Sequence, residues 1–226
     1  MKPLRKDAIL WIENTLFLKY GNMGWWPAES PDEVAIGAIL TQNTSWKNVE
    51  KSIAVLRQNR HLNCCAISSI SRDELAMEIR SSGFYNQKSL RLHSLCSKVC
   101  ADYGSLDAMR NGISLDEARN YFSAMNGIGR ETLHSILLYA LDLPVFVMDK
   151  YTERVLTRMG FMIDMKNVSS VEESFLSALD HDVDRLKNIH AMLDAVAKDY
   201  CQSRPKCREC VLNQNCDYWG KEVIVP

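Results

Sequence analysis

The sequence predicts an all-α protein built from two lobes. Apolar residues recur at helical spacing along most of the 226 residues, whereas strand-like alternation is confined to Val145–Met148. Hydrophobic residues make up 46% and charged residues 24% of the chain, which is typical of a folded protein. The length suffices for one large core or two small lobes, and Pro144 marks the expected boundary between lobes.

The helical segments follow one another along the chain. The first, Arg5–Tyr20, is amphipathic, and the mostly apolar Pro31–Gln42 predicts a central buried helix. The third, Ser71–Arg80, opens with a Ser-x-x-Glu capping pattern that Glu74 completes. The later segments are Asn86–Tyr103, Ser114–Ala124, Arg130–Leu141, Asp149–Met159, Ser170–Asp180 and Val183–Tyr200.

The charge balance gives no simple sign of a partner. A net charge of −1 and a pI near 6.5 lack the basic excess that is usual in nucleic-acid-binding proteins. Between Arg80 and Ala101, however, Arg80, Lys88, Arg91 and Lys98 occur without any acidic residue, which gives a local positive bias. An ordinary solvated helix face accounts for this stretch equally well.

The first twenty residues do not resemble a targeting segment. Asp7, Glu13 and Asn14 interrupt the apolar run, which argues against a signal peptide. No apolar stretch reaches the roughly 18 residues that a membrane span requires. We therefore expect a cytoplasmic protein without a membrane partner, and expect it to be a monomer. Because cytoplasmic thiols stay reduced, the eight cysteines call for an explanation other than disulfides.

A Gly-Ile-Gly turn lies between two helical patterns. Gly127 and Gly129 permit backbone angles that other residues resist, and they allow a backbone to approach a ligand closely. A helix is expected to begin at Arg130, so that its first N–H groups can contact a phosphate. Taken alone, the turn is equally compatible with a plain helix-turn-helix corner. Farther along, Asp149 precedes a helical pattern, which predicts a helix N-cap.

The segment from Met125 to Tyr151 resembles the helix-hairpin-helix motif and catalytic aspartate of the endonuclease III superfamily. The resemblance implies that Asp149 is catalytic and lies at the mouth of a cleft that binds damaged double-stranded DNA. It also implies a six-helix barrel over residues 25–143 that carries the hairpin. Residues 1–24 and 144–226 would then form an iron–sulfur cluster domain.

The same resemblance bears on the reaction type. The lyase branch of the superfamily carries a lysine two positions after the second hairpin glycine, where this chain has Glu131. A carboxylate cannot form the Schiff base of that branch, so the resemblance implies a monofunctional enzyme with water as the nucleophile. Lys150 is an alternative amine, but its side chain is expected to leave the helix in another direction than that of Asp149.

Three further segments resemble the 3-methyladenine DNA glycosylase III subfamily. They are Trp25–Trp46, Ser81–Leu92 and Val147–Tyr151. The resemblance implies a pocket for the flipped base lined by Trp25, Trp26, Pro27 and Trp46, with Trp46 an aromatic of a different kind from that of the subfamily. It also implies that Gln42 and Phe84 fill and wedge the gap left in the duplex. For Trp26 and Phe84 taken singly, burial in the core is the alternative.

The chemistry of such a pocket favours a cationic base. A base must leave the duplex before its glycosidic bond can be attacked. Adenine methylated at N3 is positively charged and departs as a neutral molecule, so one carboxylate, Asp149, suffices to stabilise the developing oxocarbenium ion. The tryptophans would hold the cation by stacking and cation–π attraction. Glu131 is expected to lie near the pocket and to add to this preference.

The last four cysteines, Cys201, Cys207, Cys210 and Cys216, have five, two and five residues between them. Thiolates at such spacing are typical of zinc sites as well as iron–sulfur sites. The endonuclease III resemblance implies a [4Fe–4S] cluster, although the first gap is one residue shorter than in the commonest version of the motif. The other four, Cys64, Cys65, Cys96 and Cys100, are interpreted as buried or incidental thiols.

The sequence thus predicts a base-excision-repair glycosylase that hydrolyses the N-glycosidic bond of alkylated purines, chiefly 3-methyladenine. Three alternatives remain open. The first is an endonuclease III-like glycosylase and AP lyase that acts on other damaged bases. The second is a non-catalytic DNA-binding protein of the same fold, and the third is a zinc-dependent binding module.

Overall fold

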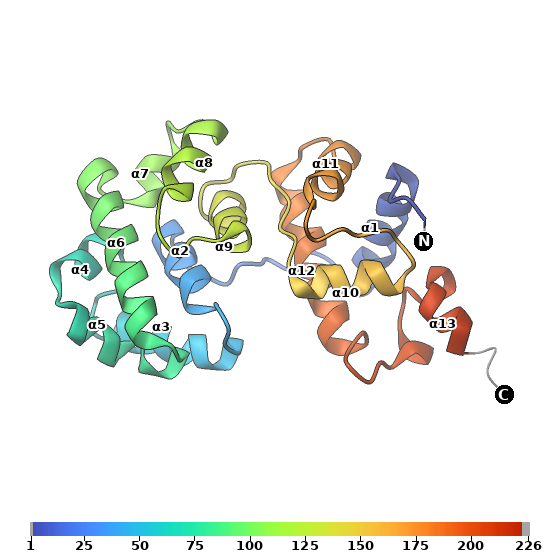
Figure 1. The fold of residues 1–226 in the computed structure, drawn as a ribbon, viewed down its shortest axis with the longest axis horizontal. Helices are drawn as coiled ribbons and strands as arrows, with labels where there is room; N and C mark the ends of the chain where they lie inside the picture. Colours follow the sequence, from blue (N-terminus) through green and yellow to red (C-terminus); the bar gives the residue numbers. More distant parts are fainter. Residues whose placement is uncertain (1, 223–226) are drawn as a thin grey trace. The chain divides into compact units, whose positions relative to one another are not determined.

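The computed structural model describes residues 2–222 and is helical throughout (Figure 1). The β pairing found among these residues is one isolated bridge between Lys2 and Phe161. The α-helices are α1 (Lys6–Tyr20), α2 (Pro31–Leu40), α3 (Trp46–Gln58), α4 (Cys64–Ser69), α5 (Arg72–Glu78), α6 (Tyr85–Tyr103), α7 (Leu106–Arg110), α8 (Leu115–Ser123), α9 (Arg130–Ser135), α10 (Lys150–Arg158), α11 (Ser169–Ala178), α12 (Val183–Asp199) and α13 (Asp217–Glu222). In the described part of the chain, no helix has both the length and the apolar character needed to cross a membrane.

The chain divides into two compact units. The first combines Met1–Trp25 with Pro144–Pro226, and the second is Trp26–Leu143. Along the chain, the first boundary between the units lies between Trp25 and Trp26, and the second lies between Leu143 and Pro144. Trp25 therefore belongs to the unit that contains α1 and the C-terminal helices, whereas the expected boundary lay one residue earlier.

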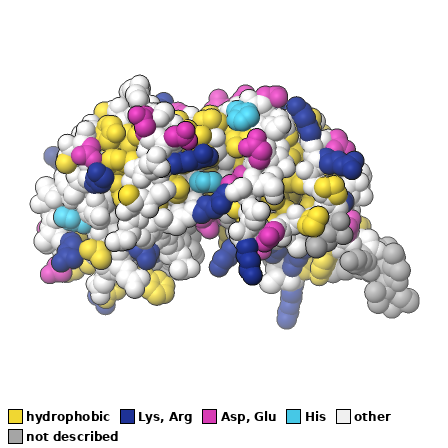
Figure 2. Space-filling view, turned by 45° about the horizontal axis from the view of Figure 1, so that its top comes forward, with side chains coloured by type: hydrophobic (Ala, Val, Ile, Leu, Met, Phe, Trp, Pro, Cys, Tyr) yellow, Lys and Arg dark blue, Asp and Glu magenta, His cyan; other side chains and the backbone are white. Residues whose placement is uncertain are grey.

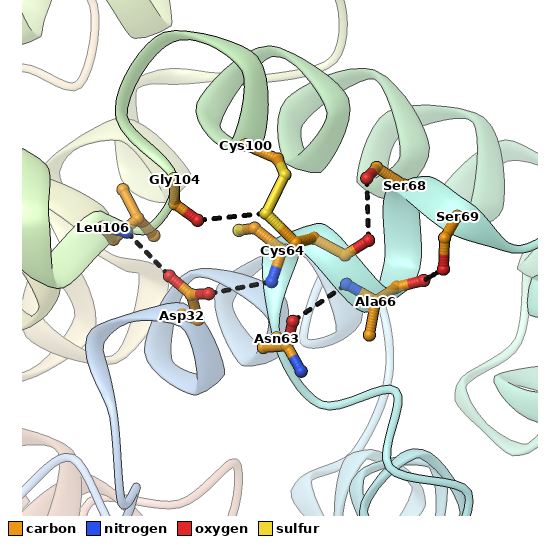
Figure 3. Close-up of a disulfide and its surroundings, with 10 residues drawn as sticks. Asp32, Asn63, Cys64, Ala66, Ser68, Ser69, Cys100, Gly104 and Leu106 are labelled. Carbon is orange, nitrogen blue, oxygen red and sulfur yellow. Dashed lines mark hydrogen bonds between the residues drawn. A yellow bond between two sulfur atoms is a disulfide. The ribbon is translucent and has the colours of Figure 1, made fainter.

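Helix α2 forms the centre of the second unit. All of its residues after Pro31 are buried, as its apolar composition predicts. The buried carboxylate of Asp32 accepts hydrogen bonds from the backbone N–H groups of Cys64 and Leu106, each at 2.8 Å (Figure 3). These two N–H groups belong to the first residues of α4 and α7, which have no acceptor within their own helices. One carboxylate on α2 thus fixes where two neighbouring helices begin.

Several local predictions differ from the structure. The sequence predicted no helix at α3, α4, α7 or α13, of which α4, α7 and α13 are only six, five and six residues long. The strand-like candidate Val145–Met148 is not a strand, because this segment pairs with no strand among the described residues. All four of its side chains are buried, so its apolar run reflects burial in a connection rather than sheet formation. The N-cap at Ser71 is confirmed, since its hydroxyl accepts from the N–H of Glu74 at 3.1 Å.

The expectation that the cysteines form no disulfide is wrong for one pair. Cys65 on α4 and Cys100 on α6 are joined by a disulfide, with their Cα atoms 5.1 Å apart (Figure 3). The sequence does not predict this pair, because its members are 35 residues apart and only the packing of α4 on α6 brings them together. Cys64 and Cys96 are buried thiols, as expected. The pKa of the Cys64 thiol is raised far above its ordinary value. The main cause is a hydrogen bond with Cys96, and the second is burial.

The first unit packs α1 against α11 and α12 and α10 against α12. Its core includes the stacked rings of Phe146 and Phe175, whose centroids lie 3.8 Å apart. Arg185 on α12 forms two hydrogen bonds with the carboxylate of Glu13 on α1, at 2.8 and 2.6 Å, and this pairing raises the pKa of Arg185. Buried Phe146 anchors the connection that leads to Asp149, three residues farther along.

Candidate active site

Asp149 is the N-cap of α10 in the first unit. Its Oδ1 atom accepts a hydrogen bond from the N–H of Thr152 at 2.7 Å, which fixes the side-chain rotamer. The positive end of the helix dipole attracts a negative charge at this position. Its Oδ2 atom lies 4.0 Å from Nε2 of His190 on α12, and the two side chains are only 13% and 8% exposed. The carboxylate is thus held rigidly, with its second oxygen facing a buried imidazole.

Aromatic and basic side chains lie near the start of α10. The ammonium of Lys198 on α12 lies 5.3 Å from the ring centroid of Tyr151 and 5.8 Å from that of Trp25. Cation–π attraction therefore associates Trp25 with α10 and α12 within the first unit. Lys150, the residue after Asp149, is exposed.

The second unit contains a pocket of about 290 Å³ with an aromatic wall. Three residues predicted to hold the base, Trp26, Pro27 and Trp46, line it together. The rings of Trp26 and Trp46 meet edge to face with centroids 5.6 Å apart, and Tyr139 packs on Trp26 in the same manner at 5.7 Å. Gly37 of α2 lies beneath this wall, where a Cβ atom would be in tight contact with the Trp26 ring, at 3.3 Å.

Three charged residues also line this pocket. The buried carboxylate of Glu33 pairs with Arg57 at 2.7 Å, so these two charges offset each other. Glu50 lies one turn after Trp46 on α3, and its Oε1 atom accepts a hydrogen bond from the indole N–H of Trp46 at 3.1 Å. Glu50 is exposed and forms no ion pair with another described residue. The pocket therefore combines aromatic faces with one carboxylate whose charge is not offset.

The two remaining residues predicted for the base pocket are not among the residues that line it. Trp25 belongs to the first unit. Glu131 is exposed in the first turn of α9 and is not among the residues that line the aromatic pocket. Glu50, which the sequence did not single out, is the carboxylate that lines this pocket without a cationic partner among the described residues. Its spacing of four residues from Trp46 would have indicated it, had α3 been predicted.

The hairpin glycines differ from each other in conformation. Gly127 has φ +85°, and a Cβ atom there would overlap the side chain of Arg91. Gly129 has extended backbone and is the N-cap of α9, followed by the exposed Arg130. Of the two glycines, therefore, only Gly127 needs the freedom of glycine, and it needs it partly to accommodate Arg91.

Gln42 is held tightly in the turn after α2. Its Nε2 atom donates to the carbonyl of Gly127 at 3.1 Å and to the hydroxyl of Thr132 at 2.9 Å. Its Oε1 atom accepts from the guanidinium of Arg91 on α6. Both ends of the amide are therefore fixed before any ligand binds.

Phe84 is not a core residue. Its side chain is 63% exposed, although a phenyl ring is usually buried in a folded protein. Its backbone has φ +47° and ψ 31°, a left-handed conformation that is uncommon for a residue with a bulky side chain. Such strain persists where the surrounding structure holds it, and it often marks a functional position.

The four C-terminal cysteines line one pocket in the first unit. Other walls of this pocket are Arg158, Tyr200, Pro205, Asn213, Tyr218 and Trp219. The guanidinium of Arg158 lies 3.3 Å from Sγ of Cys201, and the Sγ of Cys216 donates to the Arg158 carbonyl at 3.5 Å. Burial raises the pKa of the Cys210 thiol. The pocket thus offers four sulfur donors, and α10 is bonded directly to its wall.

Surface charge is mixed rather than concentrated. Lysine and arginine side chains are interspersed with aspartate and glutamate on the face that Figure 2 shows. Within the basic stretch that begins at Arg80, Lys88 is buried and Arg91 is half-buried. The positive bias of this stretch is therefore directed partly into the protein.

Comparison with known proteins identifies the family. The model of the HhH-GPD superfamily base excision DNA repair proteins matches residues 36–181, which include the hairpin glycines and Asp149. The chain belongs to the HhH-GPD superfamily. As a member of this superfamily, the protein is a base-excision DNA glycosylase.

Relatives with this HhH-GPD fold span nearly the whole chain. The candidate DNA repair glycosylase MJ1434 of Methanocaldococcus jannaschii is 37% identical over 96% of this chain and 99% of its own. Endonuclease III of Haemophilus influenzae is 28% identical over 85% of this chain and 86% of its own. The Helicobacter pylori 3-methyladenine DNA glycosylase MagIII, bound to 1,N6-ethenoadenine, superposes with a TM-score of 0.73 at 26% identity, covering 85% of this chain and 96% of its own.

Proposed function

We propose that this glycosylase removes positively charged alkylated purines, 3-methyladenine foremost, from double-stranded DNA. The observation that supports this proposal is the aromatic pocket of Trp26, Pro27 and Trp46 with the carboxylate of Glu50 at its edge. A cationic base gains attraction from indole faces, at about 0.5–2 kcal/mol for each ring. It gains further attraction from the carboxylate, whereas a neutral base gains little from either. In this proposal Trp25 contributes a further aromatic face to the bound base.

Asp149 carries out the hydrolysis in this proposal. Once the base has left the stack, the bond between C1′ and the base nitrogen breaks, and the bonding electrons leave with the base. A base that is already cationic departs as a neutral molecule and needs no acid. The charge of Asp149 stabilises the oxocarbenium ion by roughly 4 kcal/mol, for charges about 4 Å apart at an effective dielectric constant near 20. Water then attacks C1′ and transfers a proton to the carboxylate or to solvent, which leaves an abasic site.

The proposed enzyme has no lyase activity. Glu131 stands where the lyase branch has its lysine, and its carboxylate cannot form an imine with the sugar. The only amine adjacent to Asp149 in sequence is that of the exposed Lys150. Since successive helical side chains diverge by about 100°, we assign Lys150 to contact with the DNA backbone rather than to attack on the sugar.

Several residues are assigned to the DNA itself. Gln42 fills the space vacated by the flipped nucleotide, and Phe84 wedges between neighbouring bases. The exposure of the Phe84 ring supports this role. Gly127, Gly129 and Arg130 of the hairpin contact a phosphate, for which exposed backbone N–H groups and a guanidinium are suited.

The four C-terminal cysteines are proposed to hold a [4Fe–4S] cluster. The residues present fit this group, because four sulfur atoms and no competing nitrogen or carboxylate ligand line the pocket. When bound, the cluster would supply a covalent link across the loop from Cys201 to Cys216. Arg154 and Arg158 of α10 bond the carbonyl of Cys201 at 2.7 and 3.2 Å, so this loop supports the helix that Asp149 begins. Zinc remains the alternative, and metal analysis of the purified protein separates the two.

Release of free base from methylated duplex DNA tests the proposed function, with the wild type compared with Asp149→Asn. We expect the wild type to release 3-methyladenine and the variant, which keeps the shape of the side chain, to release none. Release of other bases together with a borohydride-trapped adduct would instead favour an endonuclease III-like glycosylase and lyase. Binding without release of any base would favour a non-catalytic role and contradict the proposal.

A further inference from the structure

Lys88 is the largest fully buried side chain in the described part of the protein. It lies on α6 with 1% of its surface exposed, and its ammonium donates to the carbonyls of Leu40 and Ser82, each at 2.7 Å. Leu40 comes two residues before Gln42, and Ser82 comes two residues before Phe84. One buried ammonium thus joins the two turns that present these side chains.

Both carbonyls that accept from Lys88 lie at the end of a helical segment. Leu40 is the last residue of α2, and the carbonyls of a helix C-terminus lack partners within the helix and favour a positive charge. Ser82 ends the 3-10 turn Arg80–Ser82, just before Gly83. A buried ammonium is costly unless it is hydrogen-bonded, and the two carbonyls supply acceptors for that of Lys88.

The two turns are also strained in the same way. Asn43, next to Gln42, has φ +53°, and Phe84 has φ +47°. Left-handed conformations of residues other than glycine persist only where the surrounding structure holds them. The bonds from Lys88 lie just ahead of both strained residues, so they fix the backbone from which each turn departs.

Arg91, one helical turn after Lys88, continues the same arrangement. Its guanidinium donates to Gln42, and its side chain lies against Gly127. Burial, with a smaller effect from the charge of Arg91, lowers the pKa of Lys88 to about 8. Helix α6 therefore offers two cations from one face to the segments that carry Gln42 and Phe84.

We propose that Lys88 is a positioning residue that sets the spacing between Gln42 and Phe84 for joint insertion into DNA. Because it is buried, it acts through the backbone and does not touch DNA. The proposal rests on the proposed insertion of Gln42 and Phe84, and it is independent of which base is excised. Arg91 complements it by fixing the amide of Gln42.

The test measures the affinity of the protein for a duplex with a stable abasic-site analogue, so that no base enters the pocket. The fluorescence of a 2-aminopurine placed beside the abasic site reports the unstacking of that base. Lys88→Met keeps the length of the side chain but leaves both carbonyls without their donor. We expect Lys88→Met to weaken abasic-site binding about tenfold or more and to reduce the 2-aminopurine signal, with affinity for undamaged duplex retained. Leu56→Ala, a buried substitution in the same unit, serves as the stability control and is expected to change neither signal.

A mutant cycle separates positioning from general destabilisation. If Lys88 acts through the two inserting residues, adding Lys88→Met to Gln42→Ala/Phe84→Ala should cost no further affinity. A further tenfold loss in the triple variant would overturn the proposal. The proposal would also be overturned if Lys88→Met kept both the abasic-site affinity and the 2-aminopurine signal of the wild type.

The Gln42 and Phe84 single variants test the insertion premise, and Lys88→Arg replaces Lys88→Met if that variant does not fold. If Gln42→Ala and Phe84→Ala themselves leave abasic-site binding intact, the insertion premise fails, and the positioning proposal fails with it, whatever base the enzyme removes. If Lys88→Met does not fold, Lys88→Arg replaces it, because the bulkier guanidinium keeps the charge but cannot reproduce the geometry of the ammonium. Amide exchange in residues 41–44 and 83–85 should then increase. Unchanged exchange with full abasic-site binding in this variant would overturn the proposal.

Discussion

The imidazole Nε2 atom of His190 lies 4.0 Å from the Oδ2 atom of Asp149. The distance is too long for a hydrogen bond but short enough for an electrostatic interaction. Because the N–H of Thr152 occupies the other carboxylate oxygen, His190 borders the oxygen that the proposed reaction would use. A residue on α12 thus bounds the position of a carboxylate on α10.

Replacement of His190 by alanine should reduce the rate of base release. The cavity it leaves would allow the carboxylate of Asp149 to shift, and a misplacement of about 1 Å can cost up to roughly a hundredfold in rate. We expect the single-turnover rate to fall about tenfold with little change in DNA affinity. His190→Gln, which fills more of the space of the imidazole, should lose less of this rate than His190→Ala. Equal losses in the two variants would contradict a packing role for His190.

Replacement of Glu50 by glutamine should change specificity more than overall activity. The amide oxygen of glutamine can still accept from the Trp46 indole, so the change removes the charge and keeps the contact. We expect kcat/KM for 3-methyladenine to fall about tenfold, a cost of roughly 1.4 kcal/mol, and that for neutral 1,N6-ethenoadenine, if it is excised, to stay unchanged. Glu131→Gln is the matched control outside the pocket. A fall for the neutral base alone would contradict the assignment of Glu50.

The stability contributed at Lys88 should depend on pH. Its pKa is about 8 in the folded protein, against an ordinary value of 10.5. Between these two values the unfolded chain binds more protons at this lysine than the folded chain does, so the free energy of unfolding rises with pH. The wild type should therefore gain stability relative to Lys88→Met between pH 7.5 and pH 9.5, as measured by urea unfolding. A constant difference would mean that burial does not perturb this lysine.

Loss of any one C-terminal cysteine should abolish metal binding. Protein purified without oxygen should contain about four irons per chain if a [4Fe–4S] cluster is present and about one zinc if it is not. Arg158→Met should weaken metal retention, since Arg158 bonds the backbone and sulfur of Cys201. Arg204→Met, in the exposed part of the same loop, is the control. Equal metal content in all variants would exclude these cysteines as ligands.

The disulfide should stabilise the second unit without affecting the chemistry. Closing a loop of 35 residues is worth about 3–4 kcal/mol in the chain-entropy estimate. The raised pKa of Cys64 keeps this neighbouring thiol protonated and slow to exchange with the disulfide. Reducing agent should lower the Tm of the wild type but not that of Cys65→Ser/Cys100→Ser. Glycosylase activity should be equal in both at low temperature, and an unchanged wild-type Tm would show that the bond is not formed in solution.

Much of the fold follows from local sequence patterns. Helical periodicity and capping residues act over a few positions, so the long helices other than α3 are placed correctly to within a few residues of their ends, as in Pro31–Gln42 against α2. Short helices such as α7 carry too few residues to show a period. Short apolar runs are ambiguous, and the strand-like pattern of Val145–Met148 belongs to a buried connection.

The sequence by itself determined the helical class, the hairpin glycines, the N-cap aspartate and the four clustered cysteines, because each depends on spacing within a short segment. Only the tertiary structure decided which groups act together. It joined Cys65 to Cys100, brought His190 to Asp149, and directed Lys88 inward to the carbonyls of Leu40 and Ser82. The physical reason is that such contacts connect residues far apart along the chain, and their geometry depends on how whole helices pack.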